Sequence, residues 1–445
     1  MQAVHIIGGG LAGSEAAWQL AVRGIPVRLL EMRPHTATGA HRSPHLAEIV
    51  CTNSFKSTLI ENASGLLKAE LDILGCRLLA VAQSVRVPAG HALAVDRDLF
   101  AGAVTEAIEG QPNITVDRKR QDDLDLPLPA IVATGPLTAG ALSGALRDHC
   151  SSEHLYFYDA IAPSVDADSI DEGEGYWASR YGKGTADYFN IPLDRAKYAA
   201  LVGRIRGADV VTPHAFEDRK YFESCLPVEV MVERGEDTLR YGPLKPKGLI
   251  DPRSGREPYA VVQLRQESHG GTLLGLVGFQ TRMTYLAQKE VLRSLPGLRR
   301  ARILRYGSIH RNIFLNIPTL CEPYQRDRVR PGLHYAGQIC GVEGYVECIM
   351  SGLVAALSVY AGLRGRVVPP LPAGTMVGSL MTHIHTPTRN FQPMNANMGI
   401  VPRVEQSRGS RRERYRRISE RACATMTAYR EDHPWLFEEA AARSA

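Results

Sequence analysis

Three glycines near the start of the chain have the spacing of a dinucleotide-binding loop. Gly8, Gly10 and Gly13 follow an apolar strand predicted at residues 3–7 and open an amphipathic helix predicted at residues 11–22. In such a turn the first glycine permits the tight bend, the second lets a pyrophosphate approach the backbone, and the third lets the helix pack closely on the strand. The N–H groups of the helix's first turn would then face the phosphates.

An acidic residue stands where ribose recognition is expected. Glu31 follows a second apolar strand, predicted at residues 26–30, and lies eighteen residues after Gly13. A carboxylate at this place can accept hydrogen bonds from ribose hydroxyls. Because strand, glycines, helix, strand and acid occur together, they favour a dinucleotide site over an ordinary glycine-rich loop. The residues expected to form it are Gly8, Gly9, Gly10, Leu11, Ala12, Gly13 and Glu31.

Later segments are expected to complete the same domain. Residues 96–116 predict a helix and a strand, residues 130–135 a buried strand ending at Gly135, and residues 333–338 a strand containing Gly337 near its end. A small-residue helix predicted at residues 348–360 follows, and a second helix start of this kind lies near the flavin end of the cofactor in FAD enzymes. The pattern therefore favours FAD over NAD as the tightly bound dinucleotide, with Gly135, Gly337, Glu343 and Tyr345 beside it.

Between these segments the sequence changes character. Residues 187–310 alternate strand-like stretches, at 260–264 and 272–279, with polar turns such as 251–255. We predict an α/β fold in which a Rossmann-like FAD-binding domain of the two-dinucleotide flavoprotein type is discontinuous. It would comprise residues 1–186 and 311–445, including a C-terminal tail, and residues 187–310 would form an inserted, smaller α+β domain.

The composition of the 445 residues indicates the cellular compartment and the state of the cysteines. No uninterrupted apolar run reaches membrane length and no signal peptide precedes the first strand, so we expect a cytoplasmic protein. The eight cysteines show neither a CxxC motif nor zinc-type pairing with histidine. We therefore expect reduced thiols and no metal site.

The charge distribution is more informative than the net charge of +5, which is no nucleic-acid signature by itself. Residues 403–421 contain eight arginines and three glutamates. Such a segment can bind phosphates by releasing counterions. A solvated helix face with Glu–Arg pairs explains the same pattern equally well.

Several motifs in order along nearly the whole chain resemble one family. They lie at residues 8–13, 47–54, 87–90, 221–227, 241–246, 277–281, 310–312, 341–347 and 391–397. In these blocks the chain is similar to the folate- and FAD-dependent tRNA uracil-54 C5-methyltransferases, which are relatives of the larger tRNA-modifying flavoprotein GidA. The resemblance implies a GidA-like FAD-binding fold.

The resemblance also implies a reaction. The chain would methylate C5 of uridine 54, in the T arm of tRNA, to 5-methyluridine. 5,10-Methylenetetrahydrofolate would supply the carbon, reduced FAD the hydride, and NAD(P)H would reduce the flavin again. The partners implied are tRNA, the folate cosubstrate and the nicotinamide reductant, with no membrane and no obligate protein partner.

Methylation of uracil at C5 requires a thiolate, which a cysteine can provide. Uracil C5 becomes nucleophilic once a thiolate adds to C6, and forming a thiolate requires a neighbouring base, cation or helix N-terminus. The resemblance makes Cys51 and Cys225 the functional pair, and we favour Cys225 as the nucleophile and Cys51 as its acid/base partner. His310 is a candidate for stacking on the folate pterin. Lys245 and Lys247 are candidates for contacts with RNA phosphate or the folate glutamate tail.

Two other functions compete with this interpretation. One is a GidA-like enzyme that modifies the wobble uridine of tRNA with a GTPase partner, but that family is longer and has additional C-terminal helices. The other is a small-molecule FAD oxidoreductase or a flavin-stabilised binding protein. This second alternative would leave the motifs around Cys51 and Cys225 unexplained.

Overall fold

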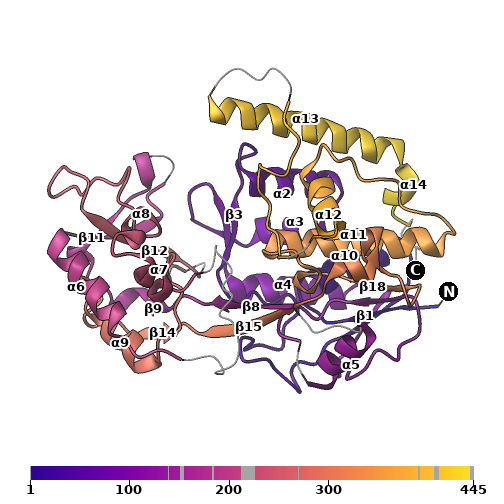
Figure 1. The fold of residues 1–445 in the computed structure, drawn as a ribbon, viewed down its shortest axis with the longest axis horizontal. Helices are drawn as coiled ribbons and strands as arrows, with labels where there is room; N and C mark the ends of the chain where they lie inside the picture. Colours follow the sequence, from indigo (N-terminus) through magenta and orange to yellow (C-terminus); the bar gives the residue numbers. More distant parts are fainter. Residues whose placement is uncertain are drawn as a thin grey trace.

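Two sheet-based bodies lie side by side in the computed structural model (Figure 1). The structure describes residues 2–138, 140–150, 155–182, 185–211, 226–268, 270–388, 391–404 and 410–440. The antiparallel strands β8 (Leu155–Ala160) and β15 (Ile309–Phe314) pair with each other between the bodies. The chain therefore leaves the first body and returns to it through one two-stranded ribbon.

The first body contains a mostly parallel sheet. Within the described residues it has seven strands in the order β16-β17-β18-β7-β1-β2-β6, and β18, β7, β1, β2 and β6 run parallel. The strands are β1 (Val4–Ile7), β2 (Val27–Leu30), β6 (Ile114–Asp117), β7 (Ala130–Val132), β16 (Cys321–Glu322), β17 (Arg326–Asp327) and β18 (Leu333–Tyr335). The predicted strand at the start of the chain and those near residues 26–30, 130–135 and 333–338 are confirmed.

Apolar side chains alternate between the two faces of this sheet, as expected for strands covered on both sides. On β1, Ile6 packs into one hydrophobic core and Ile7 into another on the opposite face. Helices cover the sheet (Figure 1). They are α1 (Leu11–Ala21), α2 (Ala63–Ile73), α3 (Arg77–Ser84), α4 (Arg97–Glu109), α5 (Gly140–Cys150), α10 (Ile317–Leu320) and α11 (Tyr345–Leu363).

The two central helices, α1 and α11, pack closely because small residues line their contact. A Cβ at Gly352 would lie 2.2 Å from the carbonyl oxygen of Ala12. By length and composition α11 could cross a membrane, and among the described helices it alone passes that test. Most of its residues are buried against α1 and the surrounding core, as in the core helix of a globular protein.

The second body is built on an antiparallel sheet. Its strands have the order β10-β11-β12-β13-β9-β14. They are β9 (Ser164–Asp166), β10 (Tyr176–Trp177), β11 (Tyr188–Leu193), β12 (Ala260–Gln266), β13 (Leu273–Leu276) and β14 (Ile303–Arg305), and the helices are α6 (Arg195–Arg206), α7 (Val228–Arg234), α8 (Thr238–Tyr241) and α9 (Tyr285–Arg293). This sheet includes strands that precede residue 187, and the domain boundaries at 186/187 and 310/311 stay a prediction.

The remaining elements extend the first body. A small sheet contains β3 (Ser54–Ser57), β4 (Arg86–Val87) and β5 (Ala92–Val95), and the C-terminal part contains α12 (Met376–His385), α13 (Arg411–Asp432) and α14 (Pro434–Phe437). The last described residue returns to the end of α1, where the amide of Ala440 donates to the carbonyl of Val22 at 2.8 Å.

Candidate functional site

The glycine loop has the geometry that its sequence predicts. Gly8 has φ +100, and a Cβ there would lie 2.5 Å from the carbonyl oxygen of Ala133. A Cβ at Gly13 would lie 1.9 Å from the carbonyl oxygen of Gly8. At Gly10, by contrast, a Cβ would have no described heavy atom within 4 Å, and α1 begins there without a side-chain cap. The loop therefore leaves room for a pyrophosphate at the start of the helix.

Two other predicted glycines follow strands of the same parallel sheet. Gly135 follows β7 with φ +71, and Gly337 follows β18 with φ +85. A Cβ at Gly337 would lie 3.0 Å from the side chain of Ala12. Segments that are far apart in the sequence thus converge at the carboxyl ends of β1, β7 and β18, where ligands of doubly wound sheets bind.

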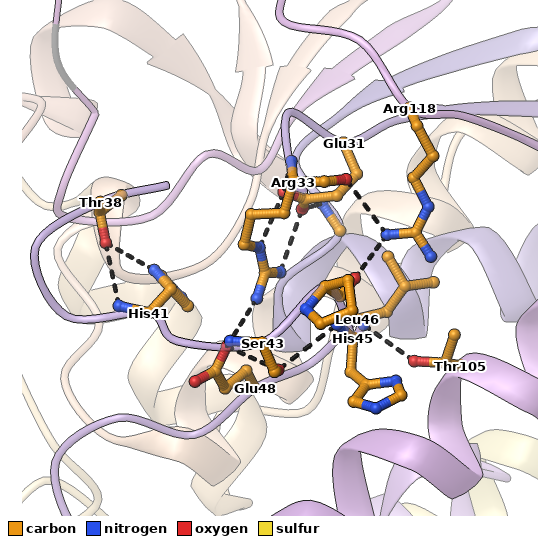
Figure 2. Close-up of polar contacts among 12 residues, drawn as sticks. Glu31, Arg33, Thr38, His41, Ser43, His45, Leu46, Glu48, Thr105 and Arg118 are labelled. Atoms are coloured by element: carbon orange, nitrogen blue, oxygen red, sulfur yellow. Dashed lines mark hydrogen bonds and ion pairs between the residues drawn. The ribbon is translucent and has the colours of Figure 1, made fainter. Parts of the chain in front are cut away.

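Glu31 is buried beside the loop in a network of hydrogen bonds (Figure 2). Its Oε2 accepts from the amide of Gly9 at 2.9 Å, and its Oε1 accepts from the amide and Nε of Arg33 at 3.0 and 2.9 Å. Burial alone would raise the pKa of this carboxyl, but the bonds and charge of Arg33 and the bond from Gly9 outweigh it and lower the pKa below its ordinary value. Glu31 therefore stays ionised as an acceptor. Its contact with ribose hydroxyls stays a prediction.

The loop at residues 33–48 is fixed against the glycine loop by the same network (Figure 2). Arg33 Nη1 donates to Glu48 Oε2 at 3.0 Å, and the hydroxyl of Ser43 donates to the same oxygen at 2.9 Å. The amide of Ala47 donates to the carbonyl of Gly9 at 2.8 Å. This loop leads directly to Cys51, so one continuous segment connects the dinucleotide-type loop with the predicted thiol.

The start of α11 holds the backbone of Cys51. The phenol oxygen of Tyr345 accepts from the amide of Cys51 at 2.9 Å and from the amide of Thr52 at 3.0 Å. Burial, followed by the proximity of Cys51, raises the pKa of Tyr345 far above its usual range, so the phenol stays protonated. Cys51 itself is half-buried and is not part of a disulfide. Two predicted site residues, one assigned to the cofactor and one to catalysis, are thus brought together.

Three arginines surround the Cys51 segment. Arg97 Nη2 donates to the carbonyl of Cys51 at 3.4 Å, and Arg305 donates to the carbonyl of Val50. Arg265 Nη2 donates to the side-chain oxygens of Thr52 and Asn53, both at 2.7 Å. Arg265 and Arg305 belong to β12 and β14 of the second body, so the segment lies between the two bodies.

These arginines were missed by sequence reasoning. Arg97 is the first residue of a predicted helix, and the capping residue Asp96 indicates where that helix starts but not that Arg97 binds Cys51. No local signal distinguishes Arg265 or Arg305 from the other arginines of this arginine-rich chain. Their role depends on contacts across more than two hundred residues of sequence.

Glu343, a predicted cofactor-binding residue just before the start of α11, is also buried. The carboxylate of Glu343 accepts from the side-chain amide of Gln338, and its own amide donates to the carbonyl of Met394 at 2.9 Å. In the first turn of α11, Glu347 Oε1 accepts from the amide of Ala396 at 2.9 Å. The motif at residues 391–397 therefore lies across the start of this helix.

The other predicted residues are placed less informatively. Cys225 lies outside the described residues, although Val228, shortly after it, donates its amide to the carbonyl of Gln280 in the second body. His310 lies on β15 opposite Asp159, and its side chain is outside the described part of the structure. Lys245 and Lys247 are exposed on the loop after α8, where Lys247 Nζ lies 3.7 Å from Glu257 Oε1.

The site combines a glycine loop at the carboxyl ends of a parallel sheet with a second helix start and an attached antiparallel body. These features together define a class of proteins. It is the class of two-body dinucleotide-binding proteins with a flavoprotein-type fold. The family model described as "Glucose inhibited division protein A" matches residues 3–366.

Relatives of known name match the chain over its whole length. A "Methylenetetrahydrofolate--tRNA-(uracil-5-)-methyltransferase TrmFO" of Geobacter sulfurreducens is 50% identical over 436 residues, which cover 98% of this chain and 99% of that protein. The protein of the same name from Syntrophomonas wolfei is 46% identical over 432 residues, which cover 97% and 99%. The chain belongs to the TrmFO family, within the wider GIDA family.

Two solved structures support the fold. Aquifex aeolicus GidA in its form II crystal has a TM-score of 0.68 at 16% identity and covers 98% of this chain and 75% of that one. The form I crystal of the same protein has a TM-score of 0.65 at 16% identity, with coverages of 97% and 79%. The predicted fold class, a Rossmann-like domain of the GidA type, is confirmed.

Proposed function

We propose that this protein methylates C5 of uracil in tRNA, with 5,10-methylenetetrahydrofolate as carbon donor and FAD as cofactor. The observation that carries the proposal is the 50% identity, over nearly all of both chains, to a protein named for this reaction. The full-length match favours this function over a GidA-like wobble-uridine enzyme and over a small-molecule FAD oxidoreductase.

The finer features of the proposal rest on the motif resemblance. The target is uridine 54 in the T arm, NAD(P)H reduces the flavin, and the enzyme acts in the cytoplasm without an obligate protein partner. The discontinuous domain plan, residues 1–186 and 311–445 around 187–310, belongs to the same proposal.

FAD fits the residues that the structure brings together. Gly8 to Gly13 leave space at the start of α1 for the pyrophosphate, Glu31 offers ionised oxygens for the ribose, and Gly135 and Gly337 border the same space. Glu343 and Tyr345 stand at the second helix start. Reduced FAD, when bound, supplies the hydride that converts the transferred methylene into a methyl group.

The two cysteines act on the uracil in this mechanism. The thiolate of Cys225 bonds to C6, and the resulting C5 enolate attacks the methylene carbon of the folate. Cys51 removes the C5 proton as the tetrahydrofolate amine leaves, which gives an exocyclic methylene at C5. Hydride, which reduced FAD would supply, adds to this methylene to form the methyl group, and the Cys225 thiolate then leaves C6. His310 stacks on the pterin, and Lys245 and Lys247 contact RNA phosphate or the folate tail.

The position of Cys51 suits a proton-transfer role. Its amide is bound by the phenol of Tyr345, the first residue of α11, and its segment continues from the loop that is bound to Gly9. Tyr345 and Arg97 act as positioning residues through their hydrogen bonds to the amide and the carbonyl of Cys51.

Transfer of labelled carbon from 5,10-methylenetetrahydrofolate to an unmodified tRNA transcript tests the function. With NAD(P)H present, we expect the label in 5-methyluridine at position 54, and none in a transcript in which cytidine replaces that uridine. Formation of 5-methyluridine with S-adenosylmethionine alone, or failure of transfer by flavin-loaded enzyme, would overturn the proposal.

A further inference from the structure

The long C-terminal helix α13 carries its charges against its own dipole. Between Arg411 and Arg421 it has six arginines and two glutamates, which leaves four positive charges in excess. Its last turn contains Glu431 and Asp432 beside one arginine, Arg430, and so carries a net negative charge. A helix favours acids at its N-terminus and bases at its C-terminus, so both ends of α13 oppose the usual arrangement.

Tertiary contacts keep this helix folded and in place. Ser410 and Glu413 form a reciprocal capping box at its N-terminus. Ile418 and Ala422 are buried in the main core of the first body, and the hydroxyl of Ser419 donates to the carbonyl of Ile60 at 2.5 Å. The arginines are therefore displayed on a fixed scaffold. Where a sequence departs from local preference without a structural benefit, a functional reason is expected.

The six arginines have different positions on the body. Arg412 is paired with Glu61, and Arg421 Nη2 donates to the carbonyls of Pro402 and Gly374 at 2.8 and 3.0 Å, so these two attach the helix to the body. The guanidinium of Arg411 lies over the ring of Tyr415, 5.1 Å from its centre. The other three, Arg414, Arg416 and Arg417, form an exposed group. Within it, Arg416 lies 3.4 Å from Glu420 in an exposed pair, a type of contact that contributes little stability.

The helix lies near the chain that leads away from Cys51. It crosses over α2 on the outside of the first body (Figure 1). Its contacts at Ile60 and Glu61 involve residues only nine and ten positions beyond Cys51. A polyanion bound along α13 would thus lie beside residues 60–61, in the chain that continues from the segment carrying the candidate thiol.

We propose that the N-terminal half of α13 is a phosphate-binding surface for the backbone of the tRNA substrate, with Arg414, Arg416 and Arg417 as its exposed contacts. The inference rests on the proposed function, because tRNA is the polyanion that this function supplies. Arginine binds phosphate through a planar set of donors. Arg414 and Arg417 are three positions apart, so they are neighbours on the helix surface and lie about 4.5 Å apart along its axis. These contacts position the RNA and read no base.

The experiment compares two triple variants of the full-length, FAD-loaded protein. Arg414→Gln/Arg416→Gln/Arg417→Gln removes the exposed contacts and leaves Arg412 and Arg421 in place. The control, Arg195→Gln/Arg204→Gln/Arg206→Gln, removes the same charge from α6 in the second body, away from α13 (Figure 1). The α13 variant loses the exposed pair of Arg416 with Glu420, and the control loses the exposed pair of Arg206 with Glu236.

Binding of an unmodified tRNA transcript is measured by fluorescence anisotropy across a series of salt concentrations. We expect the α13 variant to bind about tenfold more weakly or worse, with a salt slope shallower by about two to three because up to three phosphate contacts are lost. Its KM for tRNA should rise while kcat at saturating tRNA, flavin content and melting temperature stay at wild-type values. The α6 control should bind within about twofold of wild type.

The outcomes separate this surface from the proposed function. Unchanged tRNA affinity and salt slope in the α13 variant, in an enzyme that transfers labelled carbon, would overturn the surface and leave the function standing. If the enzyme transfers no labelled carbon but the α13 variant still loses tRNA binding, the surface stands and the proposed function is overturned. If the variant loses binding to phosphatidylserine vesicles but keeps binding to tRNA, the surface serves a membrane and the proposal is wrong.

Discussion

Gly10 and Gly13 lie three residues apart, but different neighbours constrain them. A Cβ at Gly13 would overlap the carbonyl oxygen of Gly8, whereas a Cβ at Gly10 would meet no described heavy atom within 4 Å. The backbone at Gly10 has φ −74, which any residue can adopt. The two positions therefore separate the demands of folding from those of cofactor binding.

Gly10→Val is expected to fold and to lose FAD, because its side chain would occupy the space left for the pyrophosphate. The visible absorbance of the purified protein reports bound flavin. The melting temperature should match that of wild-type protein stripped of flavin, since a ligand adds stability only to the state that binds it. Gly13→Ala, as a contrast, should lower the unfolding free energy by about 1–3 kcal/mol or more through overpacking. Stoichiometric flavin in Gly10→Val would show that the site is assigned wrongly.

Cys51 and Cys225 are expected to fail at different steps. Cys225→Ala should abolish methylation because C5 stays unactivated without the C6 adduct, and Cys51→Ala should be nearly inactive because the C5 proton is not removed. A tRNA containing 5-fluorouracil distinguishes them, since fluorine at C5 blocks the proton loss that releases the enzyme. The covalent complex, detected on a denaturing gel, should survive in Cys51→Ala and vanish in Cys225→Ala. The opposite pattern would exchange their roles, and full activity in both variants would exclude the thiolate mechanism.

At the residue scale, sequence predicts what local geometry determines. The glycine loop could be read because its turn, helix start and acid lie within thirty-one residues and each has one physical role. The binding of Arg33 to Glu31 was not predicted, although the two residues are neighbours, because it depends on burial. Arg265 could not be found at all, since its partner Asn53 lies 212 positions away.

At the scale of elements, α12 starts on a buried carboxylate. Glu70, on α2, is fully buried, and its two oxygens accept from the amides of Met376 and Val377 at 2.8 Å each. Burial raises the pKa of Glu70 to about 7, although these hydrogen bonds act in the opposite direction. The junction of two helices therefore depends on a group that titrates near neutral pH.

Glu70→Gln is expected to flatten the pH dependence of stability. Because the folded-state pKa of Glu70 is raised, its contribution is fully present below the unfolded-state pKa, roughly 4.3, and is lost as pH rises through about 7. Glutamine cannot ionise, so the fall in unfolding free energy between pH 5 and pH 8 should shrink by up to about 3 kcal/mol. Denaturant titrations at these pH values measure the change. The exposed Glu420→Gln is the control and should retain the wild-type slope, and the same slope in Glu70→Gln would contradict the assignment.

Helices were predicted better than their ends. The helix predicted at residues 348–360 is real, but α11 starts earlier, at Tyr345, after Gly344 with φ +118. The bond between Glu347 and Ala396 fixes this start, and no local pattern reveals it. The strand predicted at residues 272–279 is shorter in the structure because the chain turns at Gly278, where φ is +67.

At the scale of the whole molecule, the sequence indicated an insertion between two parts of one parallel sheet, and β7 and β18 are indeed neighbours although residues 133–332 separate them. The ribbon of β8 and β15 was not foreseen, nor was the place of β9 between β13 and β14. A three-residue strand carries too little periodicity to be recognised, and its partners lie more than a hundred residues further along the chain.

Asn53 connects the two bodies beside Cys51. It is fully buried, and its Nδ2 donates to Val95 on β5 and to Gln266 on β12, each at 3.0 Å. Asn190 offers a comparison, because it is equally buried. Among the described residues its bonds lie within the second body, to carbonyls that include those of Ala178 and Tyr188. Substitutions at Asn53 and Asn190 can therefore be compared to separate the loss of a buried amide from the loosening of the contact between the two bodies.

Asn53→Ala is expected to reduce kcat for carbon transfer by roughly tenfold to a hundredfold, because displacing a reacting group by about 1 Å costs that much. Each buried partner left without its bond also costs about 1–3 kcal/mol of stability, and Asn190→Ala should lose a similar amount. Labelled-folate transfer at saturating tRNA, measured well below both melting temperatures, separates the two variants. The kcat of Asn190→Ala should stay within about threefold of the wild-type value, because this substitution leaves the hydrogen bonds around Cys51 in place. Equal loss of kcat in both variants, or none in Asn53→Ala, would mean that the contact between the bodies does not position Cys51 for the reaction.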